Sequence, residues 1–239
     1  MDDKYYELKL PSLLKPYQGV EKVEIRMLKG KDEKLLGELT IENFEKKFKI
    51  LLDNVLRGIK PEDLTIGDRF YIVVWLAINC YSSMYPIETV CTDCFRTIKV
   101  DIDLGKLDKV ELPADFKEPY PLQLTDGRTL NLRLFRVRDQ IQYLDYVKLK
   151  DKDDLNYKLS QSIVDDQDML ARIQMLDEMS TKDLGLIRAF HDKFHHGVKL
   201  ETEYKCPKCG GAGTTPVPFR LDIIFPDGAT IARSLGRSI

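Results

Sequence analysis

The sequence predicts an α+β fold, in which a helical body carries a four-cysteine zinc ribbon built from two separated, knuckle-tipped β-hairpins. Two Cys-x-x-Cys pairs, each flanked by alternating polar and apolar residues, indicate the hairpins. Apolar residues at helical spacing, before and between these pairs, indicate the helices. With 43% hydrophobic and 32% charged residues among 239, the chain can bury a core in one or two domains.

An N-terminal arm is predicted over residues 1–19. This segment is more apolar than a solvent-exposed terminus without contacts would be, and it is suited to binding in a groove on a partner protein. Its candidate partner-binding residues are Tyr5, Tyr6, Leu8, Leu10, Leu13 and Leu14. The other interpretation, that the arm packs on its own domain, stays open. A C-terminal tail over residues 226–239 has a similar but less apolar character.

A single α+β domain is predicted over residues 20–225, and it begins with a strand and a helix. Residues 20–28 alternate between apolar and charged side chains and predict a strand, and the polar residues 29–34 predict a turn. Apolar residues recur at helical spacing over 41–55 and predict a helix with one buried face.

A second helix follows, with Asp63 or Thr65 as its predicted N-terminal cap. Its residues 70–81 are apolar nearly all round, which is typical of a helix buried on most sides and places it at the centre of the core. The apolar run is far shorter than the roughly 20 residues that a membrane-spanning helix needs. We therefore expect no membrane association, and the N-terminus lacks the pattern of an export signal.

The first hairpin is predicted over residues 86–103 and the second over 198–224, each with a cysteine pair at its tip. In the second pair, Pro207 and either Gly210 or Gly211 supply the turn geometry that a knuckle demands. Residues 95–205 are then an insertion between the two halves of one site. Such an insertion is permitted because the entropy cost of loop closure grows only logarithmically with length.

The four paired cysteines predict one structural Zn²⁺ site, with Cys91, Cys94, Cys206 and Cys209 as ligands. A catalytic zinc ion keeps one position open for water or substrate, whereas four thiolates fill a tetrahedral shell and indicate a folding element. Paired spacing in a five-cysteine chain also favours a metal in a reducing compartment over a disulfide framework. The alternatives are a redox dithiol, two separate metals and no metal. A redox dithiol is expected at the N-terminus of a helix, and neither cysteine pair is predicted to start one.

The insertion is predicted to contain a hairpin and then a helical module over residues 136–197. Asp126 and Gly127 suit a two-residue hairpin turn. Three helices are predicted at 136–150, 154–164 and 166–178. A fourth is capped by Ser180 and ends at Gly197.

The histidines offer the best enzyme candidate, since His191 and His195 are spaced to reach one cation from a helix. The glutamate of the H-E-x-x-H metalloproteases is absent between them, and a histidine-rich last helical turn explains them as well. The chain has no phosphate-binding glycine loop, G-x-S-x-G elbow or dinucleotide fingerprint. We therefore expect neither enzymatic activity nor a small-molecule substrate.

Nucleic-acid binding is the alternative function, because zinc ribbons often serve it. Basic residues cluster in sequence as Arg133, Arg136, Arg138, Lys148 and Lys150. However, acidic residues interleave with them, and the 37 Lys and Arg against 39 Asp and Glu leave a net charge of -2. No strand combines aromatic and basic residues for base stacking, so a solvated mixed-charge surface is the favoured interpretation of these residues. A zinc-ribbon adaptor protein is the other form of this alternative function.

Three segments give the chain a family resemblance: IGDRFYIVVWLAINCYSS, YPIETVCTDCFRTIKVDI and LQLTDGRTLNLRLFRVRD. Over residues 20–225 the chain resembles the baseplate proteins of T-even-type contractile-tail bacteriophages, most specifically at Asp68-Arg69 and the first knuckle. Thr-Asp replaces the family's Pro-x inside that knuckle, whereas CPKC has the expected form.

The resemblance implies a non-enzymatic structural or assembly protein of the baseplate hub, present in the virion tail or in the host cytoplasm during assembly. It also implies other hub and tail proteins as partners, and several copies in a symmetric assembly.

Overall fold

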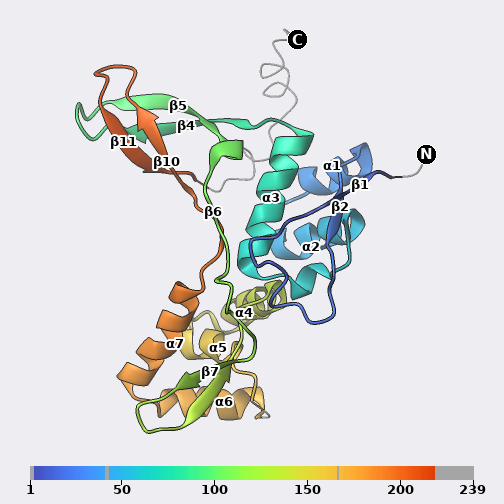
Figure 1. Cartoon of the computed structure of the whole chain (residues 1–239), viewed down its shortest axis with the longest axis vertical. Helices are drawn as coiled ribbons and strands as arrows, with labels where there is room; N and C mark the ends of the chain where they lie inside the picture. The colour runs from blue at the N-terminus through green and yellow to red at the C-terminus, as the bar shows by residue number, and fades with distance from the viewer. Residues whose placement is uncertain (1–2, 41–42, 166, 219–239) are drawn as a thin grey trace.

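The computed structural model describes residues 3–40, 43–165 and 167–218 (Figure 1). These residues form seven α-helices and several small antiparallel sheets, which agrees with the predicted mixture of helix and strand. The predicted tail over 226–239 and the end of the second hairpin region, 219–224, lie outside the described residues. Figure 1 shows two lobes stacked along the long axis, with a pair of hairpins projecting from one of them.

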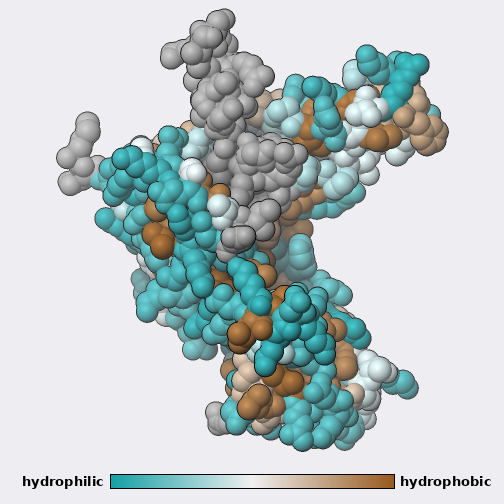
Figure 2. Space-filling model, turned by 180° about the vertical axis from the view of Figure 1, so that it is seen from behind, coloured by the Kyte–Doolittle hydropathy of each residue, from teal (hydrophilic) through white to brown (hydrophobic). Residues whose placement is uncertain are grey.

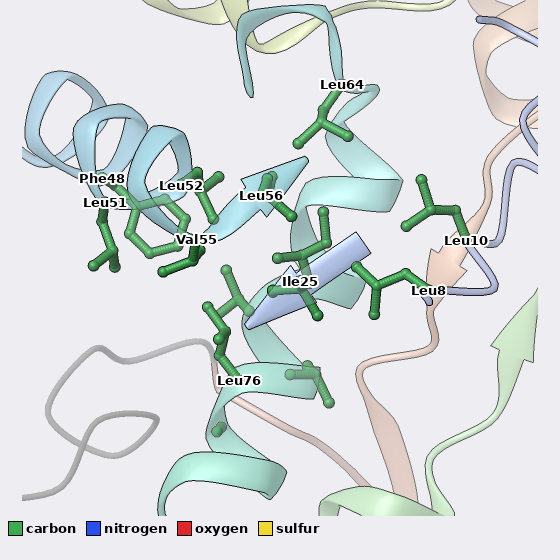
Figure 3. Close-up of a cluster of buried hydrophobic side chains, with 14 of the residues drawn as sticks. Leu8, Leu10, Ile25, Phe48, Leu51, Leu52, Val55, Leu56, Leu64 and Leu76 are labelled. Carbon is green, nitrogen blue, oxygen red and sulfur yellow. The ribbon is translucent and has the colours of Figure 1, made fainter. Parts of the chain in front are cut away.

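The first lobe is a three-stranded sheet packed against two helices. Its strands are β1 (Tyr5–Glu7), β2 (Glu24–Arg26) and β3 (Leu56–Arg57), in that order and all antiparallel. Helix α2 (Phe44–Val55) and helix α3 (Ile66–Cys80) cover it, after a short 3₁₀ turn, η1 (Pro61–Asp63). Figure 3 shows how side chains from α2, β2 and α3 converge with Leu8 and Leu10 of the N-terminal segment.

Helix α3 confirms the predicted cap and the predicted burial. The Oγ1 atom of Thr65 accepts a hydrogen bond from the backbone N–H of Asp68, which satisfies one of the free donors at the helix start. The fully buried apolar residues of α3 face α2 and the sheet, and they include Ile72, Val73, Leu76 and Ala77. This helix therefore lies at the centre of the larger hydrophobic core, as its all-round apolar sequence predicts.

The predicted polar turn at residues 29–34 is wrong, because these residues begin helix α1 (Gly30–Gly37). The carboxylate of Asp32 accepts a hydrogen bond from the N–H of Lys29 at 2.9 Å. The same carboxylate forms a bidentate ion pair with the guanidinium group of Arg26 on β2, with N–O distances of 2.7 and 3.1 Å. Both partners are buried, so a tertiary ion pair holds the helix start in a segment whose local composition favours a turn.

The second lobe is the predicted helical module with its hairpin. Strands β7 (Tyr120–Gln123) and β8 (Thr129–Leu132) form the hairpin, and the predicted Asp126-Gly127 turn lies between them. The four helices are α4 (Val137–Lys150), α5 (Leu155–Ser160), α6 (Met169–Asp177) and α7 (Thr181–Lys193). Helices α5, α6 and α7 pack with the hairpin around a second hydrophobic cluster that includes Leu132, Ile163, Leu176, Ile187 and Phe190. Val137 and Ile141 of α4 belong instead to the larger core.

Close backbone packing joins the two lobes at a pair of glycines. A Cβ atom on Gly67 of α3 would lie 2.1 Å from the carbonyl oxygen of His196, and one on Gly197 would lie 3.0 Å from the carbonyl oxygen of Gly67. Gly197 begins β9 (Gly197–Val198), which pairs with β6 (Lys109–Val110) and leads into the second knuckle. Only glycine permits this approach, so the path to the metal centre is fixed by backbone contact with α3.

Candidate metal centre

Each cysteine pair lies at the tip of an antiparallel hairpin, as predicted. The first hairpin consists of β4 (Met84–Val90) and β5 (Thr97–Asp103), and a short 3₁₀ turn, η2 (Leu104–Lys106), follows it. The second consists of β10 (Glu201–Lys205) and β11 (Ala212–Pro216). In Figure 1 the two hairpins lie together and point the same way, with their tips far from both lobes.

The two knuckles share one backbone design. In each, the residue after the second cysteine donates its N–H to the carbonyl of the first: Phe95 to Cys91 and Gly210 to Cys206, both at 2.9 Å. The N–H of Cys91 in turn donates to the carbonyl of Arg96 at 3.0 Å, and the N–H of Cys206 makes the matching bond to Gly211 at 2.7 Å. The chain therefore builds the same cysteine-bearing turn twice, from segments far apart in sequence.

The residue after the second cysteine is left-handed in both knuckles. Gly210 has φ 78°, which glycine adopts freely because it has no Cβ atom. Phe95 has φ 56°, a conformation that costs an L-residue with a side chain roughly 1–2 kcal/mol. The second knuckle therefore meets the requirement of the turn with glycine, and the first meets it with a strained aromatic residue.

The four sulfur atoms lie within 4.8 Å of one another. The sulfur of Cys91 is 3.7 Å from that of Cys209, and the sulfur of Cys94 is 3.9 Å from that of Cys206. All four thiols are free, and these separations are far longer than the about 2.05 Å of a disulfide bond. Four sulfurs held about 2.3 Å from one tetrahedral ion stand about 3.8 Å apart, so the set fits a single metal.

Electrostatics of the cluster also favour a cation. Backbone N–H groups of Cys94 and Asp93 donate to the sulfur of Cys91 and lower the pKa of its thiol to about 6. Although the N–H of Gly211 favours the thiolate of Cys209, the neighbouring sulfurs of Cys206, Cys94 and Cys91 raise the pKa of Cys209 to about 12. Protons therefore remain in the cluster unless a positive ion balances four thiolates.

Contacts between the hairpins hold the two halves of the centre together. The hydroxyl of Thr215 donates to that of Thr89 at 2.8 Å, and the N–H of Thr92 donates to the hydroxyl of Tyr204 at 3.2 Å. Tyr204 is buried with Ile98 between the strands. Convergence of the sulfurs thus rests on packing between the strands as well as on the knuckles.

Glycines make this close packing possible. A Cβ atom on Gly213 would lie 2.8 Å from the hydroxyl of Tyr204, and one on Gly211 would lie 1.9 Å from the carboxylate of Asp93. Gly211 therefore serves contact with the first hairpin in addition to turn geometry, and Gly213 leaves room for Tyr204 of its own hairpin. The sequence indicates only the turn role.

The histidines of the enzyme candidate lie in three different environments. His191 stacks on Phe135 with ring centroids 4.0 Å apart, and burial lowers its pKa to about 4. His196 is buried and shares a hydrogen bond of 2.7 Å with Thr65, whereas His195 is exposed. Within the described part of the chain, the four cysteines form the one group of three or more candidate ligands close enough to share a metal.

The candidate partner-binding residues of the N-terminal segment fall into two groups. Leu8 and Leu10 are buried in the larger core, with 4% and 1% of their surfaces exposed. Tyr5, Tyr6 and Leu14 are half-buried, and Leu13 is 44% exposed.

A buried hydrogen-bond network also ties this segment to α3. The carboxylate of Asp68 accepts hydrogen bonds from the N–H of Ser12 at 2.9 Å and from the hydroxyl of Tyr17. Tyr17 accepts in turn from the N–H of Thr65. The spacing of apolar residues in the sequence gives no signal for this network, because its partners are more than 40 residues apart.

One comparison decides the family. The model of a family described as "T4 bacteriophage base plate protein" matches residues 4–225, nearly the whole chain. The chain belongs to this family. The predicted resemblance to baseplate proteins is thus confirmed, and the match extends further toward the N-terminus, to residue 4, than the predicted residues 20–225.

Membership places this baseplate protein in the phage tail and makes other baseplate proteins its partners. No curated protein and no solved structure matches the chain. None of the described helices is long and apolar enough to cross a membrane.

Proposed function

We propose that the chain is a non-enzymatic structural or assembly protein of the baseplate hub region, and that one structural Zn²⁺ ion joins its two hairpins into a zinc ribbon. The observation that carries this proposal is the convergence of Cys91, Cys94, Cys206 and Cys209 in a baseplate-family chain. A site with four thiolate ligands has no open position for water or substrate, so the metal serves the fold.

Zinc is the metal that suits this donor set best. Four thiolates in a tetrahedron are typical of zinc or of iron bound by sulfur, and a structural role without redox chemistry favours zinc. The ion closes the long insertion between the cysteine pairs, because each hairpin supplies only half of the ligands. Residues 20–225 then work as one domain, with the second lobe held in the closed loop.

The N-terminal segment over residues 1–19 contributes partner contacts in this proposal. Leu8 and Leu10 are buried in the chain's own core, and Tyr6 and Leu14 pack partly against it. The outward contacts therefore come from the exposed Leu13 and from the exposed parts of Tyr5, Tyr6 and Leu14. Leu13 and Leu14 have φ values of 54° and 59°, and strained backbone of this kind often marks a functional segment. Leu13→Ser should preserve the fold and weaken co-purification with co-expressed hub proteins, and unaltered binding would contradict this part of the proposal.

The alternative of nucleic-acid binding draws little support from the clustered arginines. Arg133 pairs with Asp139, Arg136 with Glu118 and Arg138 with Asp63. Cations that are neutralised by carboxylates release few counterions from a nucleic acid. Binding to DNA that falls steeply between low and moderate salt would nevertheless favour this alternative.

Two measurements test the proposal. Elemental analysis of the purified, unsupplemented protein should find about one zinc per chain, and less than about half an equivalent with four reactive thiols would contradict the zinc ribbon. A mass-spectrometric inventory of purified virions and of assembling hubs should find the polypeptide in at least one of them. Its quantity relative to known hub proteins gives the copy number, for which we propose several copies in a symmetric assembly.

A further inference from the structure

Phe95 combines backbone strain with almost complete exposure of an aromatic ring. It follows the second cysteine of the first knuckle, at φ 56°, and 80% of its surface is exposed. Gly210 stands at the matching position of the other knuckle, with the same hydrogen bond and the same sign of φ. The turn itself is therefore best made by glycine, and no packing within the described residues accounts for an aromatic ring at this position.

The backbone that carries the exposed ring is part of the first knuckle. The N–H of Phe95 bonds to the carbonyl of Cys91, and the adjacent Cys94 belongs to the metal centre. A rigid, exposed aromatic side chain loses little conformational freedom on binding, which is why such residues so often dominate protein interfaces. Figure 2 shows hydrophobic surface at the projecting end of the hairpins, away from both lobes.

The charged side chains of the two knuckles indicate the charge that the partner's surface should carry. The side chains of Arg96 and Lys208 are exposed and make no ion pair among the described residues. Asp93 of the first knuckle is also exposed, and its carboxylate lies close to Gly211 of the other knuckle. A partner that covers this end of the molecule therefore meets an aromatic ring on knuckles that carry two exposed cations and one exposed carboxylate.

We propose that Phe95 is the anchor of a docking surface at the hairpin tips, and that it inserts into an apolar pocket rimmed by acidic side chains on another baseplate protein. This inference rests on the proposed function and names the surface through which it acts. Phe95 supplies the buried contact area, and Arg96 and Lys208 steer the approach and fix the orientation. The metal holds the ring in place and takes no part in the contact.

Photo-crosslinking tests the location of the contact. Full-length, zinc-loaded chain with benzophenone-alanine at position 95 is mixed with the tail proteins of the same phage, which are co-expressed without the chain. The same photoprobe at Leu170, which is 78% exposed on the other lobe, is the control. We expect position 95 to crosslink to one site on one tail protein, between apolar and acidic residues. No crosslink beyond that of position 170, or a crosslink only to a second copy of this chain, would overturn the proposal.

Substitutions separate the ring from the fold. Phe95→Gly removes both the ring and the strain, so zinc content should stay at one equivalent and the unfolding temperature should stay equal or rise. Binding to the crosslinked tail protein should fall at least about tenfold. Phe95→Trp should bind within about threefold of wild type, and Leu170→Ala should bind as wild type does. Equal binding by the Phe95→Gly chain would overturn the inference.

A charge-reversal variant tests the contribution of the exposed cations. Arg96→Glu should slow association at least about threefold at low salt, and the difference should shrink as salt rises. Failure of the proposed function is distinguishable, because wild type itself would then join no tail assembly. If wild type joins the assembly and the Phe95→Gly chain joins equally well, only the docking surface is wrong.

Discussion

The sulfur of Cys94 lies 3.9 Å from the sulfur of Cys206, a residue 112 positions further along the chain. Between them runs an entire lobe with its own hydrophobic cluster. The metal centre is therefore a long-range crosslink, and neither cysteine pair alone supplies a complete set of ligands. Loss of the metal should destabilise the contact between the hairpins much more than the hydrophobic cores of the two lobes.

Cys206→Ser should abolish stoichiometric zinc binding and unpair the hairpins. The affinity for zinc should fall by more than the 10- to 100-fold that loss of a supporting hydrogen bond costs. Hydrogen exchange should accelerate over residues 84–103 and 201–216 and stay slow in α3. Cys80→Ser is the matched control, since Cys80 lies outside the centre, and it should keep one zinc. Unchanged exchange in both hairpins of the Cys206→Ser chain would show that zinc does not hold them.

Zinc binding should strengthen as pH rises from 6 to 9. Cys209, with its pKa raised to about 12, must lose a proton to bind the metal, whereas Cys91, with its pKa lowered to about 6, is already a thiolate at neutral pH. Competition with a chromophoric chelator across this range measures the affinity. Calorimetry in buffers of different ionisation enthalpy counts the protons released at pH 7.5. An affinity that does not change with pH would contradict the assignment of thiols as ligands.

His191 should make the fold less stable in acid. Burial lowers its pKa from 6.5 to about 4, so the neutral ring stabilises the folded state above pH 6.5 and this contribution is lost as pH falls toward 4. The lost stability is about 2 kcal/mol at pH 5. His191→Phe keeps the stacking on Phe135 and cannot be protonated. Urea unfolding at pH 7.5 and pH 5 should show a smaller loss for the variant, and equal losses would refute the assignment.

Gly67→Ala should destabilise the joint between the lobes. The new Cβ would lie 2.1 Å from the carbonyl oxygen of His196, and only backbone movement relieves that clash. We expect a loss of about 3 kcal/mol or more. Gly185→Ala, at a helical glycine with nothing within 4 Å, should instead stabilise by about 0.5–1 kcal/mol. Denaturant unfolding of both variants measures the contrast, and a similar effect of the two substitutions would count against the close crossing.

Helix starts and cysteine knuckles could be predicted from interactions between residues that are close in sequence. Thr65 and Ser180 have side-chain oxygens that accept from backbone N–H groups three residues on, so the starts of α3 and α7 are readable from a few residues. The spacing within each cysteine pair indicates a knuckle, because two thiols three residues apart can face one ion from a tight turn. The polar segment that forms α1 was predicted as a turn because its decisive partner, Arg26, lies on a neighbouring strand.

The cysteine knuckles, the apolar helix at the centre of the core and the resemblance to baseplate proteins could all be predicted, because the signal for each lies in contiguous residues. Burial of Leu8 and Leu10 in the chain's own core could not be predicted, since it depends on which surfaces meet in the folded structure. The same holds for the exposure of Phe95 beside the metal centre. Backbone angles and distances between remote segments arise from packing of the whole chain, and no local pattern of residues specifies them.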